Sequence, residues 1–311
     1  MLYYPDIKFQ CALAKNIDNF YIKAVGQDGQ IRYIVKQQED IKDFKSYMNY
    51  LAFAMLQINR KWLYALKDPL YYDLYIAIDV HDKIAGFIFF YKNGEEIIFE
   101  THDAPSNTNQ RSEKLTKELI ARVIYNRLKK DIPHYELDPT SIILIRDGRT
   151  YTSEKAGFDA AIEKLKDNHI FNKGIVTGIA EVHKYSSISP RIVTEIEGFD
   201  QYENPQIGSY RILNKREGIV CNTGYPFKLR GTAKPLYITI FAGDLNIEWL
   251  LEDIFAQSLL AFAAPNKCSR NPIILKLLDD LLEPITAPVD EKIVKLGDEE
   301  DFIEEFEFQE N

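Results

Sequence analysis

Three strand-like runs follow one another closely in the first third of the chain. Residues 74–80, 84–91 and 96–100 are rich in apolar, β-branched and aromatic side chains, and the segments HDK and KNGE that join them are turn-like. Connections this short join neighbouring antiparallel strands, so the pattern predicts a meander. The sequence therefore predicts a sheet that begins with three antiparallel strands.

Helices and further strands follow this meander. An amphipathic helix is expected at 112–130, with Ser112 as its N-cap, and a buried strand at 141–148 is followed by a helix at 153–167. Three antiparallel strands, a helix, a strand and a helix are the order of the ribonuclease H fold. The predicted class is therefore α/β, a ribonuclease H-like mixed sheet flanked by helices. The other expected elements are helices at 41–66, 246–263 and 272–283 and strands at 174–184, 191–197 and 236–241.

Two aspartates stand at the ends of predicted strands. Asp79 closes the run YIAIDV, and Asp147 lies at the end of SIILIRDG. If these strands are parallel neighbours, as the ribonuclease H order requires, both carboxylates lie at the edge of the sheet where α/β proteins place their sites. Two close carboxylates repel unless a cation lies between them, and Mg²⁺ prefers such oxygen ligands. The pair predicts a metal-dependent site for phosphodiester hydrolysis; two aspartates that only cap loops are the alternative.

The charge of the chain is concentrated at one end. The net charge is −9 over 311 residues, and ten acids against two lysines in residues 290–311 account for −8 of it. The nearly neutral remainder does not exclude a nucleic-acid partner, because phosphate contacts need cations only at selected places. Three cysteines without C-x-x-C spacing argue against a disulfide framework, and no apolar run is long enough to span a membrane. A cytoplasmic protein without a membrane partner is expected.

Several motifs, in family order, resemble the PIWI domain of Argonaute proteins. They are INRKWL at 58–63, AIDV at 77–80, IRDGR at 145–149, GIAEVHKYSSISPR at 178–191, RGTAKPLYI at 230–238 and RNPIILKLLDDL at 270–281. The resemblance is to a prokaryotic-type member without the N and PAZ domains and most of the MID domain. It implies an N-terminal segment at 1–50 with a MID remnant, a PIWI domain at 51–289 and an acidic tail at 290–311.

The resemblance implies an acidic tetrad. Its members in this sequence are Asp79, Glu113, Asp147 and Asp279. The three aspartates are the implied metal ligands, and Glu113 would assist through ligand or water contacts. A Glu that only stabilises a helix start and a helix with solvated aspartates are the alternatives for Glu113 and Asp279. Glu118, farther inside the helix, is a weaker candidate for the Glu position.

Four cations match positions that the family uses for the nucleic-acid backbone. They are Lys61 in INRKWL, Lys184 and Arg191 in HKYSSISPR, and Lys234 in GTAKP. Lys61 resembles the lysine that holds the guide 5′-phosphate. Lys234 takes the place of an arginine, which keeps the charge but loses bidentate geometry. Ordinary surface cations are the alternative for each of the four.

The resemblance implies guide-directed cleavage of a nucleic-acid target strand by two-metal hydrolysis, with two Mg²⁺ or Mn²⁺ ions. The expected partners are guide and target nucleic acid, together with a protein that supplies the MID and PAZ functions. One alternative is a catalytically silent PIWI subunit that binds guide and target and acts through an effector partner. A ribonuclease H-like domain without nucleic acid is the other.

Overall fold

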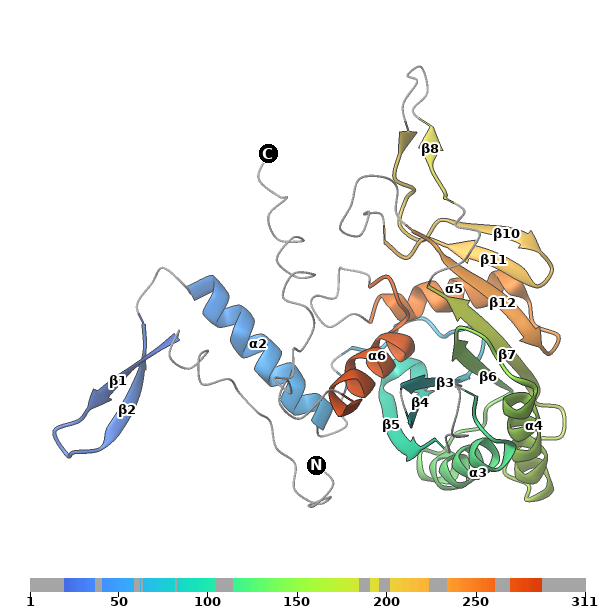
Figure 1. Cartoon of the computed structure of the whole chain (residues 1–311), viewed down its shortest axis with the longest axis horizontal. Helices are drawn as coiled ribbons and strands as arrows, with labels where there is room; N and C mark the ends of the chain where they lie inside the picture. Colours follow the sequence, from blue (N-terminus) through green and yellow to red (C-terminus); the bar gives the residue numbers. More distant parts are fainter. Residues whose placement is uncertain are drawn as a thin grey trace. The chain divides into compact units, whose positions relative to one another are not determined.

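The chain divides into two compact units, residues 1–63 and 64–311 (Figure 1). The computed structural model describes residues 20–36, 41–58, 62, 64–81, 83–104, 114–184, 191–195, 202–223, 234–260 and 269–286. The acidic tail at 290–311 lies outside the described residues. The expected boundary between residues 50 and 51 falls within a helix of the first unit.

The first unit contains a β-hairpin and a helix. Its elements are β1 (Tyr21–Val25), β2 (Ile31–Val35) and α2 (Ile41–Ile58). The two strands pair antiparallel, and the ring of Tyr21 meets that of Phe44 on α2 edge to face, with centroids 5.7 Å apart. The expected helix at 41–66 is too long, because residues 64–66 are not helical. Residues 64–66 belong to the second unit, where the Leu66 N–H donates to the Asn93 carbonyl at 2.9 Å.

Eight strands of the second unit form one mixed sheet in the order β10-β11-β12-β7-β6-β3-β4-β5. Their bounds are β3 (Leu74–His81), β4 (Ile84–Tyr91), β5 (Glu96–Asp103), β6 (Ser141–Asp147), β7 (Val176–His183), β10 (Tyr210–Asn214), β11 (Glu217–Val220) and β12 (Leu236–Ala242). Strands β3, β4 and β5 form an antiparallel meander, joined by the short 3-10 turn η1 (Lys92–Gly94) between β4 and β5. Strand β6 runs parallel to β3, and β7 runs parallel to β6. The predicted meander and fold class are confirmed.

Helices cover both faces of this sheet (Figure 1). They are α3 (Lys117–His134), α4 (Thr152–Asp167), α5 (Ile247–Ser258) and α6 (Ile273–Thr286). On one face, Ile76 and Ile78 of β3 share a core with Ile120 of α3 and Phe158 of α4. Helix α6 packs on β3 and β4, and α5 packs on β10 and β11. Among the described helices, none combines the length and apolarity needed to cross a membrane.

Helix α3 begins later than the sequence pattern indicates. Ser112 lies outside the described residues, and the helix starts at Lys117, with the Thr116 hydroxyl accepting from the Leu119 N–H at 3.2 Å. The Leu115 N–H is bonded to a side-chain oxygen of Glu154 at 3.2 Å, so the backbone here is held by α4 before the helix starts. The expectation that Ser112 caps this helix is therefore wrong.

The strands after β7 are the least well predicted. Within the expected strand at 191–197, the described residues form β8 (Thr194–Glu195), which pairs with β9 (Tyr202–Glu203) outside the main sheet, and residues 196 and 197 lie outside the described part. The hairpin β10–β11 was not expected. Every residue of β10, an outer strand of the sheet, is exposed, and its sequence YRILN lacks the alternation that marks a half-buried strand.

One buried carboxylate joins α5 to the start of β3. Asp253 accepts the Tyr71 and Tyr72 N–H groups at 2.8 and 3.0 Å and the Tyr75 hydroxyl at 2.5 Å. Burial raises the pKa of Asp253 to about 6, although these donors oppose the shift. The Asp253 carboxyl therefore keeps its proton to a higher pH in the folded state than in the unfolded chain, where the pKa of Asp is about 3.9.

The Asp253 carboxyl makes stability depend on pH. Since the folded state binds more protons between about pH 4 and 6, the stabilisation from protonated Asp253 is present at pH 4 and lost as the pH rises to 6, by roughly 2–3 kcal/mol. We expect Asp253→Asn to remove this component. Denaturant unfolding from pH 4 to 7 measures the free energy of unfolding of parent and variant, and the difference between the two values should change with pH. Asp159→Asn, on the exposed side of α4, is the control. If the difference in unfolding free energy between the parent and Asp253→Asn stays constant with pH, the assignment is wrong.

Candidate metal centre

Two of the predicted acids stand side by side at the ends of neighbouring parallel strands. Asp79 is near the end of β3, and Asp147 is the last residue of β6. The register pairs Ile78 with Arg146, so the two carboxylates leave the sheet at the same edge. Gly148 follows with φ +78°, a backbone conformation that favours glycine, and its N–H donates to the Val182 carbonyl at 3.0 Å. This glycine turns the chain away and leaves Asp147 at the strand end.

A third acid comes from α6. Asp279 lies on this helix, whose buried side includes Leu278 and Leu282. These two leucines approach Gly86 on β4 so closely that a Cβ at residue 86 would lie 2.9 Å from each of them. Gly86 pairs with Asp79 across β3 and β4. The missing side chain at Gly86 therefore lets α6 pack close to the sheet and brings Asp279 to the other two acids.

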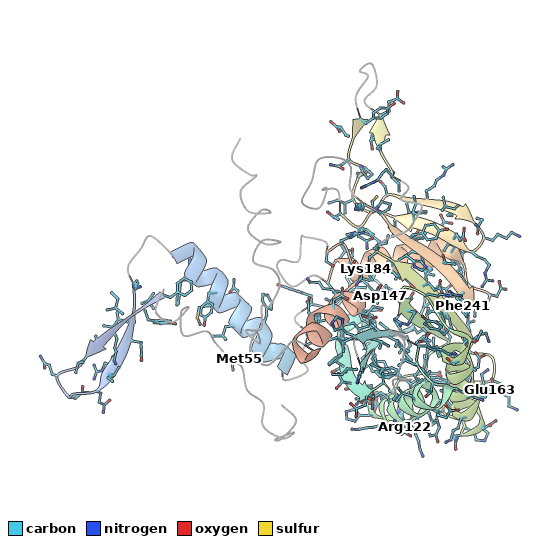
Figure 2. The ribbon with its side chains drawn as sticks, viewed as in Figure 1. Met55, Arg122, Asp147, Glu163, Lys184 and Phe241 are labelled. Carbon is cyan, nitrogen blue, oxygen red and sulfur yellow. The ribbon has the colours of Figure 1, made fainter. Side chains whose placement is uncertain are left out.

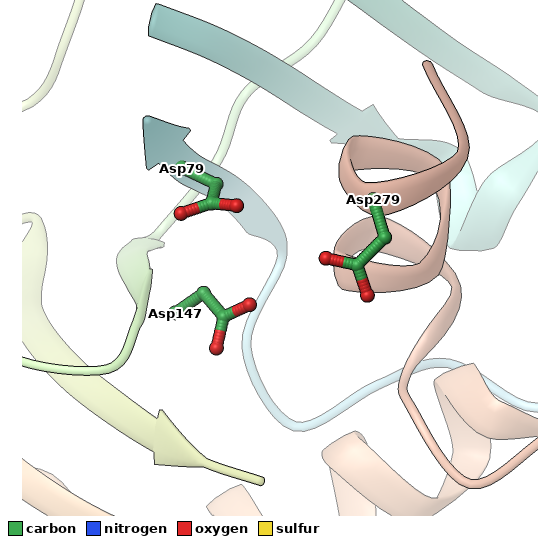
Figure 3. Close-up of side chains that lie close together, drawn as sticks. All are labelled: Asp79, Asp147 and Asp279. Atoms are coloured by element: carbon green, nitrogen blue, oxygen red, sulfur yellow. The ribbon is translucent and has the colours of Figure 1, made fainter. Parts of the chain in front are cut away.

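The three aspartates form a compact cluster. One carboxylate oxygen from each of Asp79, Asp147 and Asp279 lies within 4.8 Å of the others, and all three residues are half-buried (Figure 3). Burial raises the pKa of Asp79, and the Asp147 carboxylate adds to the shift while Arg146 opposes it. Burial also raises the pKa of Asp279, against the lowering effect of Lys184. The cluster therefore carries the electrostatic strain expected of close like charges.

A buried arginine supports the cluster from within the sheet. The Arg146 guanidinium donates to Asp79 Oδ1 at 3.1 Å and to the Asp147 carbonyl at 2.8 Å. Its Nε lies 3.6 Å from a carboxylate oxygen of Glu154, which is buried on α4. Burial raises the pKa of Glu154, and Arg146 opposes the shift. Arg146 thus fixes the side chain of Asp79 and the backbone of Asp147.

A lysine completes the surroundings. Lys184 Nζ lies 2.6 Å from Asp147 Oδ2 and 2.5 Å from Asp279 Oδ2. Burial alone would lower the pKa of Lys184, but the two carboxylates raise it above its ordinary value. Figure 2 labels Lys184 next to Asp147. Lys184, predicted from the sequence to contact the nucleic-acid backbone, therefore lies with the acids. Its contact with nucleic acid stays a prediction.

The chemistry of the donor set fits a hard divalent cation. Three carboxylates from separate elements offer oxygen atoms to one point, as Mg²⁺ and Mn²⁺ sites require. These ions keep positions for water or phosphate oxygens when proteins hold them with few carboxylates. The residues that would hold such an ion are Asp79, Asp147 and Asp279.

The other predicted site residues have different outcomes. Glu113 and Lys61 lie outside the described residues, so their roles stay predictions. Glu118 is exposed in the first turn of α3. Arg191 and Lys234 are also exposed, Arg191 shortly before β8 and Lys234 just before β12. Their predicted contacts with nucleic acid remain untested.

Sequence reasoning missed the Arg146–Glu154 pair. A signal was present, because Arg146 interrupts the otherwise apolar strand SIILIRD, and an arginine in a buried run needs an acidic partner. The partner could not be chosen from the sequence. Glu154 resembles any acid in the first turn of a helix until the fold brings α4 against the strand.

Comparisons with known proteins identify the fold. No protein-family model matches the chain, and no curated protein sequence is significantly similar. A solved structure of Clostridium butyricum Argonaute, bound to a guide DNA (5′ deoxycytidine) and a 19-mer target DNA, is similar with a TM-score of 0.55 and 24% identity. The match covers 78% of this chain and 31% of that one, so this chain spans about a third of its length. The chain has an Argonaute-like fold, with the mixed sheet of a ribonuclease H-like PIWI domain.

The buried Arg146–Glu154 pair gives a stability test. We expect Arg146→Met to lower the free energy of unfolding by about 3–5 kcal/mol, because it leaves two acids without their buried cation. Adding Glu154→Gln should recover part of the loss. Denaturant unfolding of the two single variants and the double variant gives an interaction energy of about 1–3 kcal/mol. Additive effects, within about 0.5 kcal/mol, contradict the pairing.

Proposed function

We propose that this chain is a guide-directed endonuclease, which binds a guide and a target nucleic acid and hydrolyses a phosphodiester bond of the target strand. The observation that carries the proposal is the convergence of Asp79, Asp147 and Asp279 within 4.8 Å, at the strand edge of an Argonaute-like fold. Acids at this edge are typical of metal-dependent hydrolysis in α/β proteins. The products would carry a 3′-hydroxyl and a 5′-phosphate.

The proposed cofactor is Mg²⁺ or Mn²⁺. When bound, such an ion polarises a phosphoryl oxygen and lowers the pKa of a bound water. The chain's own task is to hold the ligands: Arg146 fixes the Asp79 carboxylate, and the packing of α6 fixes Asp279. Glu113 is proposed as a fourth acid. The resemblance implies two ions.

The proposed nucleic-acid partners follow from the similar structure, which contains a guide DNA and a target DNA. Lys61, Arg191 and Lys234 are proposed phosphate contacts, because lysines and arginines at a few selected positions are sufficient to position a nucleic-acid backbone. A further protein is proposed to supply the binding of the guide ends. The proposed organisation keeps the segment at 1–50, the PIWI domain at 51–289 and the tail at 290–311.

A second candidate function is a catalytically silent subunit that binds guide and target and acts through an effector partner. One observation favours it: the Lys184 ammonium contacts two of the three acids. A fixed cation among metal ligands can lower the affinity for a divalent ion. Both functions require nucleic-acid binding, so they differ only in whether the target is cut.

Cleavage of a defined target separates these functions. Nucleic acid that copurifies with the chain is extracted and end-labelled, and complementary targets are then incubated with the loaded protein and Mn²⁺. We expect bound guides and a single cut, and we expect Asp147→Ala to abolish cutting without loss of the guide, because it removes a metal ligand and leaves the surface cations.

Asp159→Ala, on the exposed side of α4, is the matched control and should cut like the parent. Guide binding without cutting by the parent supports the silent subunit. Equal cutting by Asp147→Ala contradicts the catalytic assignment, and absence of bound nucleic acid contradicts both functions.

A further inference from the structure

Lys184 is bound more tightly into the acidic cluster than a surface lysine would be. Its Nζ lies 2.5 and 2.7 Å from the two carboxylate oxygens of Asp279 and 2.6 Å from Asp147 Oδ2. The side chain is 16% exposed. Exposed lysine pairs are usually loose and weak, whereas this ammonium is largely withdrawn from water and contacts acids from two different elements.

The backbone of Lys184 is also fixed. The residue directly follows β7, which pairs with β6 through Asp147 and Val182 and with β12 through His183 and Tyr237. The Arg270 guanidinium donates to the Lys184 carbonyl at 2.5 Å. The lysine therefore leaves a strand end that is held on both sides, beside the strand that carries Asp147. Strand pairing and the Arg270 hydrogen bond therefore fix the position of the Lys184 backbone.

The charges of the described cluster bear on how many divalent ions it can hold. Arg146 and Glu154 form a buried pair of opposite charges, so they cancel. Three aspartates against one lysine leave two negative charges. One divalent ion neutralises these, whereas a second would leave two positive charges among these groups, or one if Glu113 joins them, in a half-buried site where repulsion between like charges is strong.

We propose that Lys184 is the second cation of the acidic site: its ammonium stays with Asp147 and Asp279 in the place of one divalent ion, and the site takes a single Mg²⁺ or Mn²⁺. The inference rests on the metal site of the proposed function and refines it. Lys184 then acts as a positioning residue, which holds two carboxylates toward the metal and neutralises them before the metal arrives.

Titration with Mn²⁺ alone tests this directly. Metal-free parent protein is titrated without nucleic acid, free Mn²⁺ is counted by electron paramagnetic resonance, and the affinity is measured by calorimetry. We expect one ion per parent chain. We expect Lys184→Met to bind its first ion at least tenfold more tightly, because the ammonium no longer repels the ion or competes for the carboxylates.

Two control variants separate this effect from a general change in charge. Lys155→Met removes one positive charge from the exposed side of α4 and should keep the parent's affinity. Lys184→Arg keeps a cation at the site and should bind Mn²⁺ more like the parent than like Lys184→Met. Thermal unfolding provides a further readout: metal-free Lys184→Met should melt below the parent, and saturating Mn²⁺ should stabilise it more than it stabilises the parent.

The outcomes distinguish this inference from the proposed function. Two ions bound by the parent, or an unchanged affinity in a folded Lys184→Met, overturns the role of Lys184 but leaves the metal site. No ion bound by either protein overturns the metal site itself. Should Lys184→Met fail to fold, the number of ions bound per parent chain and the Lys184→Arg titration still test whether Lys184 takes the place of a second ion.

Discussion

The repulsion among three close carboxylates is the constraint around which this site is arranged. Asp79, Asp147 and Asp279 bring oxygen atoms within 4.8 Å of one another in a half-buried setting. Such a cluster is unfavourable unless cations neutralise it. The chain supplies Lys184 between Asp147 and Asp279, and Arg146 beneath Asp79, whose charge is shared with the buried Glu154. These two cations explain how the fold tolerates the cluster before a metal binds.

The fold determines where the acids meet. The parallel pairing of β3 and β6 sets two strand ends side by side, which places Asp79 next to Asp147. The third acid depends on close packing of a helix against a glycine, because Leu278 and Leu282 occupy the space that a side chain at Gly86 would fill. Lys184 follows from the next parallel strand, β7. Each charged group at the site is therefore positioned by apolar packing or strand pairing.

Part of this arrangement could be predicted from the sequence. The closely spaced strand-like runs and the order of elements were sufficient for the sheet and for the meeting of Asp79 with Asp147, because short turns and parallel strands leave little freedom. Asp279 was predicted by its place in a family motif, not by periodicity. Arg146 and Lys184 were visible as charges but not as partners of these acids, since their contacts depend on which helix and strand ends the tertiary fold brings together. The exposed strand β10 was missed because its sequence has no alternating apolar pattern.

We propose that this edge of the sheet is a divalent-metal site that shares its acids with a lysine. A crystal structure of the parent protein grown with Mn²⁺, with anomalous diffraction data, would locate the metal. We expect a single anomalous peak among the carboxylates of Asp79, Asp147 and Asp279, with Lys184 Nζ still bonded to Asp147 and Asp279. Two peaks with Lys184 withdrawn, or no peak at the three aspartates, would overturn this arrangement.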